Sequence, residues 1–101
     1  MQLSVSTDSD KCLIQVSGKI DTMTAGHFEK EVISALPEAS PKLVISLKEV
    51  NYISSAGLRA FLVIGKCCKS KSLPFYLSEL DNNLLQLFKM TGFDKLFNFI
   101  G

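Results

Sequence analysis

The feature that most constrains the fold is the stretch of residues 51–58, because it joins an apolar run to the strongest helical pattern in the chain. Upstream, residues 43–47 form a short, β-prone apolar run, which is typical of a buried strand. Downstream, apolar or small residues recur at the spacing of an amphipathic helix, namely at Leu58, Phe61, Leu62, Gly65 and Cys68. Two serines, Ser54 and Ser55, are therefore predicted to lie at a strand-to-helix junction.

A serine at the start of a helix has two roles open to it. The first turn of a helix offers unpaired N–H groups and a partial positive charge. A serine side chain there caps the helix by accepting a hydrogen bond, or it carries a phosphate in a favourable field. The two roles are compatible, so the sequence indicates a cap without excluding a phosphorylation switch.

The N-terminal part of the chain predicts a hairpin followed by a helix. Short alternating segments on either side of a polar turn at residues 7–11 are typical of two antiparallel strands. A helix is expected from about residue 24 to residue 36, capped by Thr22 or Thr24 and stopped by Pro37.

The C-terminal part predicts a strand, a helix and a last edge strand. The strand spans residues 73–77, and the helix is capped by Asp81 or Asn82 and ended by Gly92. Residues 97–100 form the edge strand. Because strands alternate with helices here, this part of the sheet is expected to be largely parallel.

These elements fit one domain over residues 1–101, a length that supports a modest core. We therefore predict an α/β domain with a central mixed sheet, antiparallel at its N-terminal hairpin and otherwise largely parallel, with helices packed on it. The chain is 47% hydrophobic and 21% charged, which is typical of a globular protein and not of a disordered one.

Charge and hydropathy exclude several functional classes. Eleven basic and ten acidic residues leave a formal charge of +1, and no dense basic run provides a local footprint for nucleic acid. The first ten residues lack the pattern of a signal peptide, and no apolar run approaches the roughly 18 residues that span a membrane. We expect a cytoplasmic protein with no direct nucleic-acid contact and no membrane insertion.

Catalytic constellations are also missing from the sequence. His27 is the one histidine, and no Gly-x-Ser-x-Gly nucleophile elbow, Cys-x-x-Cys pair or Gly-x-x-x-x-Gly-Lys phosphate loop occurs. Cys12, Cys67 and Cys68 are an odd number of cysteines, which favours free thiols. Adjacent helical residues point about 100° apart, so at least one of Cys67 and Cys68 is expected to pack as a small apolar residue. We expect no enzymatic activity, no cofactor and no metal.

The run Tyr-Ile-Ser-Ser-Ala-Gly-Leu-Arg at residues 52–59, with Ser-Gly-Lys-Ile-Asp at residues 17–21, resembles the STAS domain of bacterial anti-sigma factor antagonists. The resemblance covers nearly the whole chain and implies the same mixed-sheet arrangement. In that family a partner that is both a protein kinase and an anti-sigma factor phosphorylates a serine just before the helix, and a separate phosphatase resets the switch. The resemblance therefore implies an antagonist that binds its partner, and frees the sigma factor, in the unphosphorylated form.

Placing Gly57 on the family's Gly-Leu pair puts Ser55 in the phosphoacceptor position, with Ser54 as the less favoured candidate. The chain departs from the best-known members on both sides of the acceptor, where Ser54 replaces Asp and Ala56 replaces Ser or Thr. The partner-binding residues that the resemblance implies are Asp21, Thr24, Ser54, Ala56, Gly57 and Arg59.

Each of these positions has a structural alternative. Asp21 fits an Asx turn or cap before the first helix, Thr24 fits an N-cap, and Arg59 fits a solvated helix side chain. Tyr52 suits an interface or the core, whereas Ile53 is better suited to the core. A second function also stays open: a STAS-type interaction subunit of another assembly, such as a lipid-transport complex at the inner membrane, with no phosphate involved. The missing Asp before the acceptor adds weight to that alternative.

Overall fold

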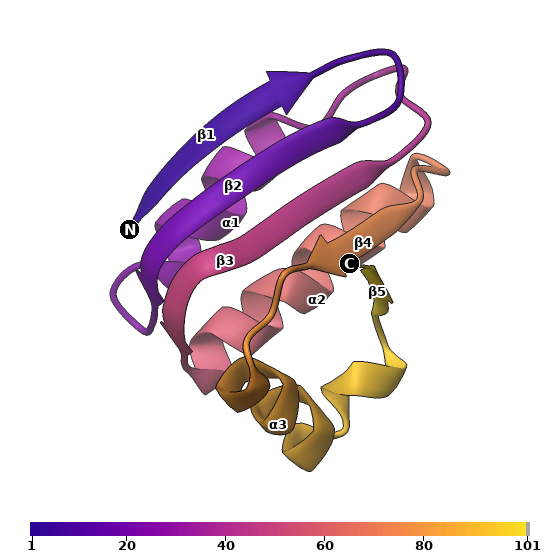
Figure 1. The fold of residues 1–101 in the computed structure, drawn as a ribbon. Helices are drawn as coiled ribbons and strands as arrows, with labels where there is room; N and C mark the ends of the chain where they lie inside the picture. Colours follow the sequence, from indigo (N-terminus) through magenta and orange to yellow (C-terminus); the bar gives the residue numbers. More distant parts are fainter. Residues whose placement is uncertain (101) are drawn as a thin grey trace.

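The computed structural model describes residues 1–100, in which five strands and three α-helices follow one another along the chain (Figure 1). In order, they are β1 (Gln2–Thr7), β2 (Cys12–Ile20), α1 (Ala25–Ser34), β3 (Leu43–Ile53), α2 (Ser55–Ser70), β4 (Phe75–Ser78), α3 (Asn82–Thr91), the 3₁₀ turn η1 (Phe93–Lys95) and β5 (Asn98–Ile100).

The five strands form one sheet in the order β1-β2-β3-β4-β5. β1 and β2 are antiparallel, and every later neighbour pair is parallel, which confirms the predicted mixed sheet. Helices α1 and α2 lie side by side behind the sheet in Figure 1, with α3 near its lower end. The face turned toward the viewer carries no helix within residues 1–100.

The core fills the space between the sheet and these helices. Three phenylalanines at its centre, Phe28, Phe61 and Phe88, come from α1, α2 and α3 respectively, and all are fully buried. The ring centroids of Phe28 and Phe61 lie 5.0 Å apart, and those of Phe61 and Phe88 lie 6.2 Å apart. Because these tilted and edge-on contacts link all three helices, a single aromatic cluster fixes their positions over the sheet.

Strand β3 is longer than predicted, because it continues beyond Leu47 to Ile53. Its second half buries Val50 and Ile53, every third residue, while the residues between them are exposed. This spacing differs from the period of two of a regular strand because the β2–β3 register shifts between Gln15 and Ser17 and again between Gly18 and Lys19. The prediction of a strand confined to residues 43–47 was therefore wrong at its C-terminal end.

The other boundaries follow the predictions closely. Asp81 Oδ1 accepts a hydrogen bond from the Leu84 N–H at 2.8 Å and caps α3, and Gly92 ends that helix in the left-handed region at φ +78°. β4 begins at Phe75 and not at Leu73 as predicted, because the Leu73 N–H donates to the Cys68 carbonyl at the end of α2 at 2.8 Å and Pro74 has no N–H to donate to a ladder.

The cysteines agree with the expectation of free thiols. Cys12 and Cys68 are buried in the core, and Cys67 is half-buried beside it. Burial, with the neighbouring Cys67 as a smaller cause, raises the pKa of the Cys68 thiol to about 11. Cys68 therefore behaves as an apolar core residue, as predicted for at least one of the helical pair.

Candidate functional site

Ser54 joins β3 to α2 and caps the helix. Its backbone is extended, at φ −85° and ψ 175°, and its Oγ accepts a hydrogen bond from the Gly57 N–H at 3.2 Å. The Ser54 N–H donates in turn to the Ile20 carbonyl at 2.9 Å, which ties the start of α2 to the end of β2. Of the two serines at the junction, Ser54 therefore has the capping role.

Ser55 is the first residue of α2, and it is exposed. Within residues 1–100 no hydrogen bond occupies its hydroxyl, and the first turn of α2 holds no acidic residue. Arg59, also exposed, follows one turn later on the same helix. The Ser55 hydroxyl thus lies at the positive end of a 16-residue helix. The first turn of this helix has no carboxylate that would offset that positive field.

Gly57 permits the close approach of α2 to the sheet. It is buried, and a Cβ built at this position would lie 2.5 Å from the Ile20 carbonyl oxygen and 2.9 Å from Ile53 Cγ2. Any side chain would push the helix away from the ends of β2 and β3. Ala56, half-buried, packs against the core on the same turn. The sequence predicted these two residues as partner contacts, whereas their contacts here are internal.

The loop after β2 is held together by Asp21 and Thr24. Asp21 Oδ1 accepts from the Met23 N–H at 3.0 Å and from the Thr24 N–H at 3.1 Å, which is the Asx turn predicted as its structural role. Thr24 occupies the N-cap position of α1, but its hydroxyl donates to the Lys19 carbonyl at 2.8 Å and accepts from the Asp21 N–H at 2.9 Å. The two side chains thus fix the loop. Thr24 lies at the predicted N-cap position, but its side chain makes no capping hydrogen bond to α1.

The Asp21 carboxylate is stabilised in its charged form. Partial desolvation works to raise its pKa, but the N–H of Met23, the hydroxyl and N–H of Thr24 and the charge of Lys19 together outweigh it. The pKa of Asp21 is therefore held below its usual value, so a negative charge is present near the junction at neutral pH.

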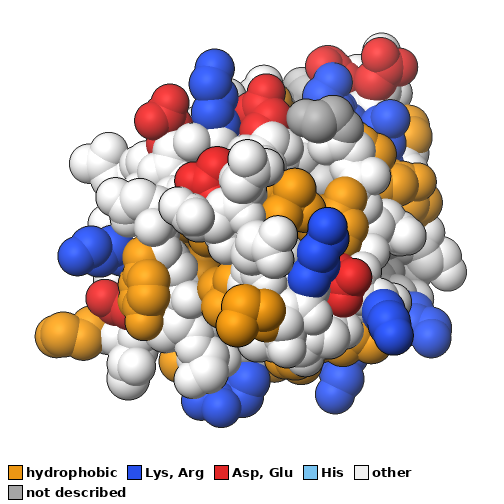
Figure 2. All heavy atoms as spheres, turned by 60° about the horizontal axis from the view of Figure 1, so that its bottom comes forward, with side chains coloured by type: hydrophobic (Ala, Val, Ile, Leu, Met, Phe, Trp, Pro, Cys, Tyr) orange, Lys and Arg blue, Asp and Glu red, His pale blue; other side chains and the backbone are white. Residues whose placement is uncertain are grey.

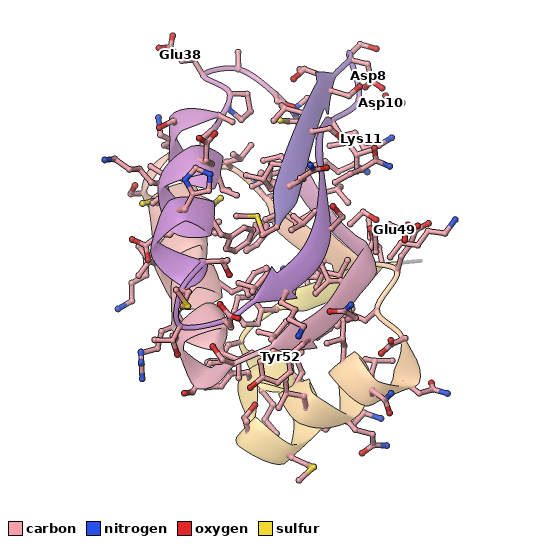
Figure 3. The ribbon with its side chains drawn as sticks, turned by 90° about the vertical axis from the view of Figure 1, so that its left-hand side faces the viewer. Asp8, Asp10, Lys11, Glu38, Glu49 and Tyr52 are labelled. Carbon is pink, nitrogen blue, oxygen red and sulfur yellow. The ribbon has the colours of Figure 1, made fainter. Side chains whose placement is uncertain are left out.

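Apolar side chains are exposed at the same end of the molecule. Tyr52 is 50% exposed and pairs with Lys19 across the β2–β3 ladder, and Met23 in the loop is 92% exposed. In Figure 3, Tyr52 lies toward the end of the sheet opposite the hairpin turn that carries Asp8, Asp10 and Lys11. Figure 2 brings the lower end of Figure 1 forward and shows hydrophobic side chains among Lys, Arg and polar ones.

Sequence reasoning identified Tyr52 as either interface or core and Ile53 as core, and Ile53 is 2% exposed. It missed Met23. The sequence did offer a signal for an exposed Met23, since it is an apolar residue within an otherwise polar turn at residues 21–24.

His27 has a separate environment. Its Nε2 lies 3.8 Å from Glu31 Oε1 on the exposed face of α1, and no hydrogen bond within residues 1–100 links it to Ser55. No helix in the described part of the chain combines the length and apolar character that crossing a membrane requires.

Comparison with known proteins identifies the class of this domain. A model of the STAS domain matches residues 2–100. The anti-sigma-B factor antagonist of Listeria monocytogenes is 32% identical over 85 residues, which cover 84% of this chain and 75% of that protein. The chain therefore belongs to the STAS-domain family of anti-sigma factor antagonists, which confirms the resemblance seen at residues 52–59.

Solved structures agree on the fold. The chain is similar to an anti-sigma factor antagonist from Mycobacterium paratuberculosis, with a TM-score of 0.81 and 25% identity over 97% of this chain and 83% of that one. It also resembles the Bacillus cell fate determinant SpoIIAA in its phosphorylated form, with a TM-score of 0.70 and 11% identity over 99% of this chain and 92% of that one. The latter likeness supports the fold alone.

Proposed function

We propose that this chain is an anti-sigma factor antagonist whose unphosphorylated form binds an anti-sigma factor with serine kinase activity, and that phosphorylation of Ser55 ends the binding. The single observation that supports the proposal is that the two serines have different roles in the structure. Ser54 Oγ accepts from the Gly57 N–H, whereas the Ser55 side chain is exposed and no group in residues 1–100 is hydrogen-bonded to its hydroxyl. A kinase therefore gains access to Ser55 without dismantling the helix cap.

The physical basis of the switch is desolvation. A phosphate on Ser55 adds roughly −1.5 to −2 charges and three acceptor oxygens. Alone in water, this group is stabilised by the N-terminus of α2 and by solvent. Inside an interface it must shed that solvent, and an unpaired buried charge costs several kcal/mol. The phosphate thus weakens the complex without unfolding the antagonist.

The surface around Ser55 suits a protein partner. Exposed Met23 and Tyr52 provide apolar area, and Arg59 provides a charged group of the type enriched at interfaces. The Asp21 carboxylate has its Oδ1 occupied by loop donors, so we assign it a positioning role in which Thr24 assists. Its negative charge also repels a phosphate on Ser55, which adds to the cost of burying that phosphate in an interface.

Ala56 and Gly57 contribute through shape. Gly57 lets α2 lie close to the sheet, and Ala56 adds no polar atom beside Ser55.

A role in a sigma-factor pathway would place the chain in the cytoplasm. A phosphatase would then remove the phosphate from Ser55 and restore binding.

The test is co-purification from the native cell with tagged wild-type, Ser55→Ala and Ser55→Asp chains, followed by mass spectrometry. We expect wild type and Ser55→Ala to retain an anti-sigma factor kinase, Ser55→Asp to lose it, and wild type to carry phosphate on Ser55. Ser70→Asp, an exposed change at the far end of α2, is the matched control and should retain the partner.

Recovery of one set of membrane-transport components by all four chains, with Ser55 unmodified, would contradict the proposal. That outcome would favour the alternative of a STAS interaction subunit that works without phosphate, in which Ser55 is only the first residue of a capped helix.

A further inference from the structure

The two edges of the sheet differ in how they are protected. β5 is an edge of only three residues, which is too short to recruit another strand effectively. β1 is an edge of six residues, and none of its residues is charged, is a proline or lies at a bulge. Natural sheets usually guard an edge of this length with one of those features, so β1 is an open template for pairing.

The free backbone groups of β1 can be identified from the hairpin. The Asp8 N–H donates to the Lys11 carbonyl at 3.0 Å, so residues 8 and 11 are a hydrogen-bonded pair. Because such pairs alternate along an antiparallel ladder, Gln2, Ser4 and Ser6 turn their backbone groups toward β2. The backbone groups of Leu3, Val5 and Thr7 therefore point away from the sheet, where no strand within residues 1–100 meets them.

The side chains on this edge are incompletely covered on the helix side. Leu3 and Val5 lie opposite the core residues Val16 and Ile14, yet Val5 is 49% exposed. A hollow of about 310 Å³ opens beside Leu3, between β1 and the face of α1 that carries His27 and Glu31. Another apolar residue next to Leu3 would complete the packing.

We propose that β1 pairs antiparallel with β1 of a second copy of this chain, forming a continuous sheet about a two-fold axis at Ser4. This register brings Leu3 opposite Val5 of the other copy as a hydrogen-bonded pair, twice by symmetry. Each Val5 then lies beside the hollow next to Leu3, and its exposed surface becomes covered.

Charge does not oppose a second copy in this orientation. The hairpin turns with Asp8, Asp10 and Lys11 come to opposite ends of the paired strands, more than about 20 Å apart. This distance exceeds the screening length of about 8 Å at physiological ionic strength, so the acidic turns do not repel each other. The strands themselves carry no charge, so nothing opposes the contact of identical edges.

The first test is sedimentation equilibrium over a wide range of protein concentration. We expect the average mass to rise from one chain toward two chains, and Val5→Lys to weaken this association at least about tenfold by charging the edge. Gln86→Lys, an exposed change on α3, is the matched control and should associate like wild type. Helical circular dichroism and melting temperature should stay close to wild type in both variants.

The second test determines the register of the β1–β1 pairing by disulfide cross-linking. In a Cys67→Ser background, which leaves only the buried Cys12 and Cys68, Ser4→Cys should form an intermolecular disulfide under mild oxidation. The two Ser4 positions are a non-hydrogen-bonded pair with Cα atoms about 4.5 Å apart, within the range of a disulfide. Ser6→Cys, which lies opposite Gln2 in this register, should cross-link far more slowly.

A chain that stays monomeric at every concentration, or a dimer that Val5→Lys leaves intact, would overturn the proposal. A monomer whose co-purified partner is lost on Val5→Lys would overturn it equally, since the edge would then serve a different chain. None of these readouts depends on Ser55, so they are separate from the test of the phosphorylation switch.

Discussion

The contact between α2 and β2 depends on the absence of a side chain at Gly57. A methyl group there meets the Ile20 carbonyl oxygen at 2.5 Å, and a backbone atom cannot rotate away as a side chain can. We expect Gly57→Ala to lower the free energy of unfolding by about 2 kcal/mol, measured by urea denaturation.

Gly26 provides a matched control, because a Cβ at this exposed position in α1 meets no atom of residues 1–100 within 4 Å. Gly26→Ala should raise the free energy of unfolding by up to about 1 kcal/mol through helix propensity. Equal effects of the two substitutions would contradict the close approach at Gly57.

The stability of the loop after β2 depends on pH through the Asp21 carboxylate. Its pKa is lowered in the folded protein, so its contribution to stability is complete above the unfolded pKa of about 3.9 and is lost as the pH falls through the folded pKa. Asp21→Asn keeps an oxygen acceptor and removes the charge. We expect wild type to melt at a higher temperature than Asp21→Asn at pH 7, and this difference to shrink below about pH 4. A difference that stays constant to pH 2.5 would show that the charge of Asp21 does not stabilise the loop.

At the scale of the element, the start of α2 shows which of two adjacent serines caps the helix, a role that the sequence left open between them. Ser54→Ala removes the acceptor for the Gly57 N–H and should cost about 1 kcal/mol, or about 4–8 °C in melting temperature. Ser55→Ala changes an exposed side chain that makes no hydrogen bond in the described part of the chain, so it should change stability by less than about 0.5 kcal/mol. Thermal melts of both variants decide the assignment, and the reverse order of effects would make Ser55 the cap.

The elements that could be predicted are those in which local chemistry and packing agree. Asp81 and Gly92 mark the ends of α3 because a carboxylate cap and a left-handed glycine are local requirements. The end of β3 could not be predicted in the same way. Its burial at Val50 and Ile53 comes from one extra β3 residue at each of the two register shifts against β2. Because those shifts are set by pairing with a strand about 30 residues earlier in the chain, a regular period of two does not predict them.

For the whole molecule, the candidate site was predicted in part. A resemblance in residues 52–59 located the junction, and the polar loop at residues 21–24 was already singled out. The roles within the site needed the fold, because the contact of Gly57 with the Ile20 carbonyl joins segments far apart in the sequence. Met23 is different, because the polar turn around it already indicated an exposed apolar side chain.

The surface around Ser55 and the open edge of β1 are two different parts of the molecule. Ser55 and Tyr52 lie where β2 and β3 end, whereas the open edge of β1 runs along the side of the sheet (Figures 1 and 3). In the proposed register Met1 lies opposite Thr7 of the second copy, so the hairpin turn of that copy comes to the end of the sheet where β2 ends.

The most direct test of the central claim is the affinity of the co-purified anti-sigma factor for two forms of this chain, one unmodified and one carrying phosphoserine at position 55 only. Titration calorimetry is expected to show binding about 100-fold weaker for the phosphorylated form, corresponding to about 3 kcal/mol for a charge desolvated in the interface. Phosphoserine at the exposed position 34, at the end of α1, should leave the affinity unchanged. Equal affinities of the unmodified and Ser55-phosphorylated forms would contradict a phosphorylation switch at Ser55.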